Sequence, residues 1–314
     1  MSPAPLLMAV PNFSEGRDPA IVEAIVEAMR AAGGEILDWS ADVDHHRCVV
    51  TVVGSPELVE RAALAGAAVA VARIDLNRHC GVHPRVGALD VLPFVPLAGL
   101  DLAAARAVAR RVGERIASDV GVPVYFYGEA SQPPGRPLSA LRRGGFEALR
   151  TSWPADRPPD VTPQGWRHEG AHPTAGVTCV GARRVLLAWN IFVTGIDDAA
   201  ARRIAVHIRE AGDGFSGVRA LALRLPSSGR LQLSMNIEDA EQASPMAVFR
   251  RVEELVQARG GEIEETEVIG MVPDSLVWQA AADRLRLRSG SVQRLLSRRV
   301  LQLVTEAGRT SQDA

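Results

Sequence analysis

Apolar and polar positions follow the same order twice along this chain. In the first half, short apolar runs predict β-strands at residues 6–10, 35–39, 47–53 and 88–95. Apolar residues recur at helical spacing after Asp18-Pro19 and after Ser55-Pro56, and both pairs are typical of a helix start. The pattern therefore predicts the order βαββαβ. A further helix and strand are predicted at 102–118 and 123–127, and loops at 132–137 and 152–173.

The second half repeats this order. Strands are predicted at residues 184–193, 218–225, 230–237 and 262–272. Helices are predicted from Asp197 to about residue 210 and from Ser244-Pro245 to about residue 259. The βαββαβ order is that of the ferredoxin-like unit. We therefore expect an α+β protein with two ferredoxin-like subdomains, residues 1–180 and 181–314, whose sheets face each other across a cleft, and a helical tail at 274–306.

The composition is that of a globular protein and bears on which partners it can bind. Hydrophobic residues make up 47% of the 314 positions and charged residues 23%, with a formal net charge of -2. This balance gives no electrostatic reason to expect a nucleic acid partner. All the cations are arginine, which suits bidentate binding of carboxylates. Three widely spaced cysteines and the absence of a long apolar run predict a cytoplasmic protein that neither spans a membrane nor is secreted.

The stretch RHCGVHPRVGALD, residues 78–90, carries the densest candidate chemistry. Glycine and proline at this density predict a shaped loop, which we call the histidine loop (residues 79–87), between a helix and an apolar strand. An imidazole on such a loop can act as a general base near neutral pH. His79 could instead support the loop or cap the preceding helix. A zinc site formed by His79, Cys80 and His83 can be drawn, although the spacing does not define its geometry.

Several segments in a fixed order resemble one protein family. They are VPNFSEGRD (10–18), LDWSADVDHHR (37–47), GVHPRVGALDVLPFVPL (81–97), VPVYFYGEA (122–130), HPTAGVTCVGAR (172–183) and AWNI (188–191). Together they resemble the formiminotransferase family over residues 8–300. The resemblance implies two ferredoxin-like subdomains with a folate cleft between them, and no cyclodeaminase half. It also implies a homodimer and no metal.

The activity that the resemblance implies is glutamate formimidoyltransferase. Such an enzyme moves the formimino group from N-formimino-L-glutamate to the N-5 nitrogen of tetrahydrofolate, in histidine degradation. His83 in the G-x-HPR motif is the implied catalytic base, and tetrahydrofolate is the co-substrate. The substrate- and folate-binding residues that the resemblance implies are Asn12, Ser14, Glu15, Arg17, His46, Arg47, Arg85, Asp160, Thr162, His172, Pro173, Gly176 and Asn190.

Two departures from the family pattern leave alternatives open. His46 stands where the family usually has asparagine, so it either touches substrate or replaces a structural asparagine. The segment from Asp160 replaces an Asp-Phe-Gly-Pro opening and is followed by a longer insert, residues 164–171. The alternatives are a folate-binding protein that has lost the reaction, and a transferase that uses a formyl or another formimino donor. We expect the remaining histidines to be surface residues: His45, His168 and His207.

Overall fold

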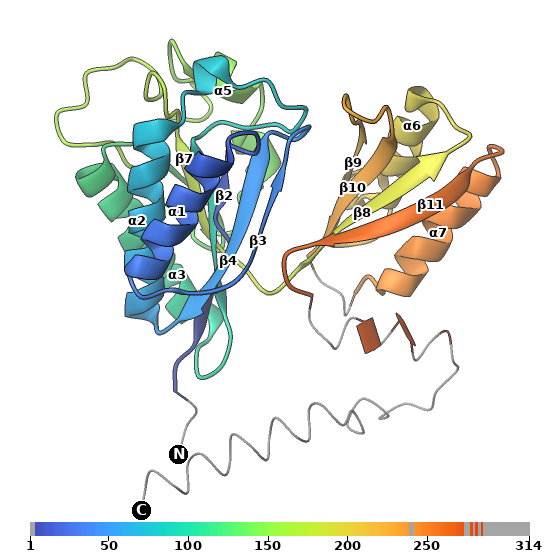
Figure 1. Cartoon of the computed structure of the whole chain (residues 1–314), viewed down its shortest axis with the longest axis horizontal. Coiled ribbons are helices and arrows are strands. Elements are labelled where there is room, and N and C mark those ends of the chain that lie inside the picture. The colour runs from blue at the N-terminus through green and yellow to red at the C-terminus, as the bar shows by residue number, and fades with distance from the viewer. Residues whose placement is uncertain (1–3, 239–241, 273–276, 279, 282–283, 285–314) are drawn as a thin grey trace, which may run out of the picture. The chain divides into compact units, whose positions relative to one another are not determined.

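Two β-sheets organise the chain in the computed structural model, which describes residues 4–238, 242–272, 277–278, 280–281 and 284 (Figure 1). The contacts divide the chain into two units. The first contains 1–185, 223–232 and 267–271, and the second contains 186–222, 233–266 and 272–314. Most of the predicted C-terminal helix, 274–306, lies outside the described residues. No helix in the described ranges is long and apolar enough to cross a membrane.

The first sheet has seven strands. They are β1 (Leu7–Ala9), β2 (Asn12–Phe13), β3 (Glu35–Asp42), β4 (Arg47–Gly54), β5 (Leu89–Pro96), β6 (Val124–Gly128) and β7 (Thr178–Ala182). β1 and β2 both pair antiparallel with β4 and β5, so they form one strand position that is interrupted before Pro11. Proline has no N–H to donate to a sheet ladder, which accounts for the break.

The strand order confirms the predicted ferredoxin-like unit and adds to it. β3 pairs with β4, β4 with β1 and β2, and these with β5, which is the order expected for βαββαβ. β7 extends the sheet beyond β5, and β6 lies outside β7, with both of these pairings parallel. No strand was predicted at β7, because its five residues show neither alternation nor a long apolar run.

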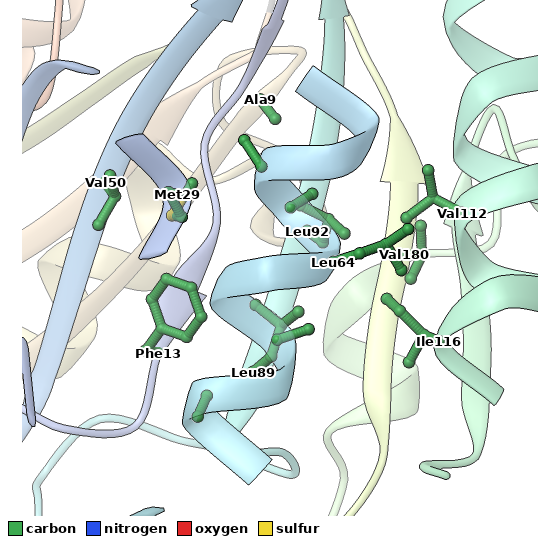
Figure 2. Packing of buried hydrophobic residues seen from close by; sticks show 14 of the residues in the cluster. Ala9, Phe13, Met29, Val50, Leu64, Leu89, Leu92, Val112, Ile116 and Val180 are labelled. Atoms are coloured by element: carbon green, nitrogen blue, oxygen red, sulfur yellow. The ribbon is translucent and has the colours of Figure 1, made fainter. Parts of the chain in front are cut away.

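Three helices cover one face of this sheet: α1 (Pro19–Ala31), α2 (Pro56–Arg73) and α3 (Leu102–Arg115) (Figure 1). The side chains of Asp18, Ser55 and Asp101 accept backbone N–H groups at the three helix starts, as expected for N-caps. One π-helical turn, η2 (Ile116–Val120), continues α3. The main core lies between these helices and the sheet. Figure 2 shows part of it, including Leu64 of α2 and Val180 of β7.

Shorter elements pack on β5, β6 and β7 through a second apolar cluster. These elements are α4 (Leu138–Leu141) and α5 (Gly145–Leu149), neither of which was predicted. Leu141 and Leu149 share this cluster with Tyr125 and Cys179. A short 3-10 turn, η1 (Leu76–Arg78), joins α2 to the histidine loop. The residues between the predicted strands thus form a folded layer that shapes one end of the sheet.

The second sheet has four strands: β8 (Leu187–Thr194), β9 (Val218–Arg224), β10 (Leu231–Ile237) and β11 (Glu262–Ile269). Their order, β11-β8-β10-β9, is that of a complete ferredoxin-like unit and confirms the prediction. Two helices, α6 (Asp198–Ile208) and α7 (Pro245–Gln257), pack against each other, and a 3-10 turn, η3 (Glu210–Gly212), follows α6. That the two sheets face each other across a cleft stays a prediction.

Candidate functional site

Several loops meet at one end of the first sheet, where β2 ends and where β4 and β5 begin. The histidine loop packs directly on the turn before β4. A Cβ added to Gly81 would overlap the carbonyl oxygen of His45 and lie 2.7 Å from the Cβ of His46. Only glycine allows this close approach of two backbones. The sequence of the histidine loop therefore determines its position against that turn.

A buried carboxylate holds the base of the histidine loop. Asp90 on β5 is 0% exposed and accepts hydrogen bonds from the backbone N–H groups of Val86 (2.8 Å) and Gly87 (3.2 Å). Arg47 donates to Asp90 at 2.7 Å, and Arg142 forms a second, close ion pair with the same oxygen. Burial alone would raise the pKa of Asp90, but the two guanidinium groups hold that pKa well below its usual range. Asp90 is therefore a fixed negative charge.

His83 presents one nitrogen for chemistry. Its Nδ1 lies 2.8 Å from the carbonyl oxygen of Pro84. Because a carbonyl can only accept, Nδ1 carries the proton and Nε2 keeps its lone pair. Nε2 has no hydrogen-bond partner in the part of the chain that the structure describes. Burial lowers the pKa of His83 well below its ordinary value, and Arg47 and Arg142 lower it further against the opposing effect of Asp90.

His79 has the opposite tautomer and a supporting position. Its Nδ1 accepts hydrogen bonds from Arg85 Nε (3.1 Å) and Gly81 N (3.3 Å), so its proton lies on Nε2, which donates to the carbonyl oxygen of His46 at 2.8 Å. Burial lowers the pKa of His79 to about 4. Both ring nitrogens are used within the protein. His79 is therefore a neutral residue that holds the histidine loop in place.

His46 stacks on His79, with ring centroids 4.2 Å apart and an interplanar angle of 8°. Its backbone is left-handed (φ 50°), a conformation in which asparagine and histidine are enriched among non-glycine residues. Its Nε2 lies 3.1 Å from a carboxylate oxygen of Glu15, while its buried Nδ1 has no partner among the described residues. The left-handed backbone therefore gives a conformational reason for a histidine or an asparagine at this position.

Three further charged side chains, Arg85, Glu15 and Arg17, are hydrogen-bonded to neighbouring segments. Arg85, 9% exposed, forms a bidentate pair with Glu147 at 2.7 and 2.9 Å. Glu15 accepts backbone N–H groups from residues 16, 17 and 18. Burial raises the pKa of Glu15, but these hydrogen bonds and His46 outweigh burial and lower that pKa. Arg17 donates to the carbonyl oxygen of Val43 (2.9 Å) and to the backbone and sulfur of residue 80.

The histidine loop and the segment around Arg142 border a polar cavity of about 510 Å³, a size suited to a small-molecule ligand. Its lining residues are His79, Gly81, Val82, His83, Pro84, Arg85, Arg142, Gly144, Gly145 and Glu147. The whole lining belongs to the first unit. The structure thus brings the predicted base His83 to the wall of a cavity that also contains a guanidinium group that the sequence analysis did not select.

Most of the predicted site residues of the N-terminal segments gather around this cavity or support its walls. They are Asn12, Glu15, Arg17, His46, Arg47, His83 and Arg85. Asn12 accepts from Arg47 at 2.8 and 3.1 Å, and therefore orients that guanidinium. Ser14 is 2% exposed and donates to the carbonyl oxygen of Gly87 at 2.7 Å. Its hydroxyl holds the histidine loop and has no open surface toward a ligand.

The predicted folate segment divides into two parts. The turn that contains His172, Pro173 and Gly176 lies beside the histidine loop, because Val177 donates to the carbonyl oxygen of Val86 at 2.9 Å. His172 Nδ1 accepts from the backbone N–H of residue 175 at 3.0 Å and closes this turn. Asn77 donates to the carbonyl oxygen of Pro173 at 2.9 Å.

The other part of this segment lies farther along the sheet. Asp160 accepts the N–H of Phe126 on β6 at 2.7 Å and pairs with Arg136. Two strand spacings separate β6 from β5, which amounts to about 10 Å. Thr162 is exposed. Asn190 is buried on β8 of the other sheet, in the second unit.

Sequence reasoning missed three charged residues of the site: Asp90, Arg142 and Glu147. The signal for Asp90 was present, since a carboxylate inside a strand that is otherwise apolar predicts an ion pair. Arg142 and Glu147 belong to the unpredicted segment around α4 and α5. The expectation for His45 was wrong, because it is 8% exposed, lies 3.0 Å from Asp42 and has its ring centroid 6.0 Å from that of His83. The other two predicted surface histidines, 168 and 207, are exposed.

A zinc site formed by His79, Cys80 and His83 conflicts with the hydrogen bonds that these residues make. Both nitrogens of His79 are already bonded, and the sulfur of Cys80 lies 3.0 Å from a nitrogen of Arg17. Among the described residues, no three His, Cys, Asp or Glu side chains are placed to hold a metal ion.

Comparison with known proteins assigns the family. A family profile described as "Formiminotransferase domain, N-terminal subdomain" matches residues 6–183, and one described as "Formiminotransferase domain" matches 188–306. The chain is 33% identical to a glutamate formimidoyltransferase of Streptococcus pyogenes, covering 86% of this chain and 90% of that protein. It is 34% identical to a glutamate formimidoyltransferase of Thermoplasma acidophilum, covering 94% and 97%.

Another relative is longer than this chain. A formimidoyltransferase-cyclodeaminase of Gallus gallus is 37% identical, and the match covers 88% of this chain and 52% of that protein. The chain thus spans about half the length of the bifunctional relatives. The cavity with His83 at its wall, the two profile matches and these identities lead to one conclusion: the chain belongs to the formiminotransferase family.

Proposed function

We propose that this protein is a glutamate formimidoyltransferase, which transfers the formimino group of N-formimino-L-glutamate to N-5 of tetrahydrofolate. The observation that carries the proposal is the state of His83: Nδ1 donates to the carbonyl of Pro84, and Nε2 is left as a base at the wall of a polar cavity. The names of the relatives from Streptococcus pyogenes and Thermoplasma acidophilum support the same activity.

In the proposed reaction, N-5 of the folate adds to the amidine carbon of the donor and forms a new C–N bond. His83 Nε2 takes the proton that N-5 loses. The bond from that carbon to the glutamate nitrogen then breaks, and the imidazolium returns the proton to the leaving amine. One C–N bond is made, one is broken, and the proton ends on glutamate. A positioned base of this kind contributes roughly 100- to 10,000-fold to the rate.

The fixed charges around His83 suit this role. Asp90, Arg47 and the backbone of the histidine loop form a rigid support beneath His83. The surrounding charges therefore need to move little during proton transfer. His79, stacked on His46 and bonded to Arg85, prevents the loop from turning away. These residues position His83 and are not proposed to react.

For the co-substrate, we propose that tetrahydrofolate lies along residues 160–176, from the turn at 172–176 beside the histidine loop toward Asp160 at β6. Gly176, with φ 72°, lets the backbone approach residue 86 closely. Added folinic acid should protect this segment from proteolysis, and unchanged cleavage at saturating folinic acid would reject the assignment. A cytoplasmic location and a homodimer stay predictions.

The test of the proposed function is a direct assay. The purified protein is mixed with N-formimino-L-glutamate and tetrahydrofolate, and the methenyl product is measured by its absorbance after acid treatment. Parallel reactions replace the donor with N-formyl-L-glutamate or with the formimino derivatives of aspartate and glycine. Turnover with formiminoglutamate supports the proposal. Binding of folate without turnover of any donor, or turnover only with another donor, would reject it in favour of the corresponding alternative.

A further inference from the structure

The three arginines among the predicted substrate- and folate-binding residues, Arg17, Arg47 and Arg85, already have partners inside the protein. Arg47 donates to Asp90 at 2.7 Å, and Arg85 uses two nitrogens on Glu147. All three guanidinium nitrogens of Arg17 donate hydrogen bonds, to the carbonyl oxygens of Val43 and Cys80 and to the sulfur of Cys80. A new anion could bind these groups only in competition with the present contacts.

Arg142 differs from these three residues. It follows α4, its side chain is 13% exposed, and it lines the cavity beside His83. Among the residues that the structure describes, its hydrogen-bond partner is Asp90, bonded through Nη2, and its buried Nε has no acceptor there. Leaving a charged donor unsatisfied in this way is costly. Because Asp90 occupies only Nη2, the end of the guanidinium that lines the cavity keeps N–H groups for an acceptor, whereas the buried Nε is closed to a ligand.

The charges that face His83 do not balance. Asp90 on β5 supplies one negative charge, while Arg47 on β4 and Arg142 after α4 supply two positive charges. His45, from the turn before β4, also faces the ring and supplies no compensating negative charge. Arg85 on the cavity wall is neutralised by its pair with Glu147. One positive charge beside His83 is thus left uncompensated.

We propose that this cavity is a carboxylate subsite in which Arg142 binds a carboxylate of the amino-acid donor, and that the bound carboxylate supplies the negative charge missing beside His83. The identity of the donor in this proposal rests on the proposed function. The cavity of about 510 Å³ is large enough for an amino acid side chain and its carboxylates.

This subsite couples binding to base strength. In the free enzyme the low pKa of His83 makes Nε2 a weak base. A carboxylate placed about 6 Å from the ring would raise that pKa by about 0.5–2 units, depending on the local dielectric. The base then becomes effective when the donor is bound. The kcat profile, which reports the complex, should have its ascending limb at higher pH than the kcat/KM profile, which reports the free enzyme.

The first experiment uses the wild-type protein and glutarate, a dicarboxylate that cannot react. The His83 resonance is assigned in labelled protein by its loss in His83→Ala, and its pKa is measured by NMR with and without saturating glutarate. We expect an upward shift of at least about 0.5 unit. An unchanged pKa, or no binding of glutarate at all, overturns the proposal.

The second experiment compares two neighbouring arginines. Arg142→Gln should raise the Kd for glutarate at least about 10-fold, as expected for loss of a charge-assisted bidentate contact. Arg143→Gln is the matched control, because Arg143 is 66% exposed and pairs with Asp156 outside the cavity lining. Its Kd should stay within about 2-fold. Equal effects of the two substitutions would contradict the subsite.

Folding and function are separated in this design. If Arg142→Gln fails to fold, Arg142→Lys retains a charge for Asp90 but loses the planar fork, and should still weaken glutarate binding. Neither NMR nor binding requires turnover. A protein that binds glutarate through Arg142 but transfers no formimino group would refute the proposed function and retain the subsite. If the wild type turns over but Arg142→Gln binds glutarate as tightly as the wild type, the subsite is refuted and the proposed function is retained.

Discussion

The two cavity histidines are held in opposite tautomers by partners that can only accept or only donate. The carbonyl of Pro84 keeps the proton of His83 on Nδ1, whereas Arg85 Nε keeps the proton of His79 on Nε2. One ring therefore exposes a lone pair and the other has none to spare. At the residue scale, these hydrogen bonds support the proposed division between a reacting His83 and a supporting His79.

Removal of the reacting histidine should affect turnover more than binding. We expect His83→Ala to lower kcat at least about 100-fold with little change in folate affinity, because the lost proton transfer belongs to the transition state. The matched control is His207→Ala on α6, an exposed histidine outside the site. Its kcat should stay within about 2-fold. Retained turnover with lost folate affinity in His83→Ala would make His83 a binding residue.

The supporting histidine should appear in the pH dependence of stability. Burial lowers the pKa of His79 from 6.5 to about 4, so between these values the unfolded chain binds more protons than the folded one. The free energy of unfolding therefore falls as pH decreases from 6.5 toward 4. In His79→Gln this slope should be smaller by up to about 1.4 kcal/mol per pH unit. Urea unfolding at several pH values measures both slopes, and identical slopes would contradict the assignment.

At the scale of elements, close backbone approaches position the loops of the site. The histidine loop touches the turn before β4 at Gly81, and the turn after His172 touches the histidine loop at Gly176. Gly81 and Gly176 each lie in a motif segment that the sequence analysis identified, residues 81–97 and 172–183. Which loop each glycine meets depends on the sheet order, because β2, β4 and β5 bring their ends together.

A methyl group at Gly81 should displace the histidine loop. The Cβ of alanine would overlap the carbonyl oxygen of His45, so we expect Gly81→Ala to lower stability by about 2 kcal/mol or more and to reduce kcat strongly. Gly165→Ala is the control, because its Cβ would meet open space and only its positive φ (73°) costs energy, about 1 kcal/mol. Thermal unfolding and the transfer assay measure both effects. Wild-type kcat in Gly81→Ala would show that the loop position is not essential.

At the scale of the whole molecule, each sheet has the ferredoxin-like strand order, but the first sheet is extended by β6 and β7. The segment around α4 and α5, which supplies Arg142 to the cavity lining, packs on this extension. The main core lies on the opposite face of the same sheet, between the sheet and α1, α2 and α3, and Figure 2 shows part of it.

Two leucines test this core. Leu92 on β5 is 0% exposed, and its replacement by alanine should lower the free energy of unfolding by about 2–5 kcal/mol. Leu37 on β3 is 47% exposed, and Leu37→Ala should change that free energy by no more than about 0.5 kcal/mol. Urea unfolding measures both. Similar losses in the two variants would show that the assignment of core and edge is wrong.

The sequence by itself determined the order of strands and helices, the caps at Asp18 and Ser55, and the loop character of the histidine-rich stretch, because these depend on local periodicity and turn chemistry. Only the tertiary structure decided which charges meet. Asp90 pairs with arginines 43 and 52 positions away, and such pairs leave no local pattern. The same holds for β7, since a short strand buried between two parallel neighbours carries no alternation of its own.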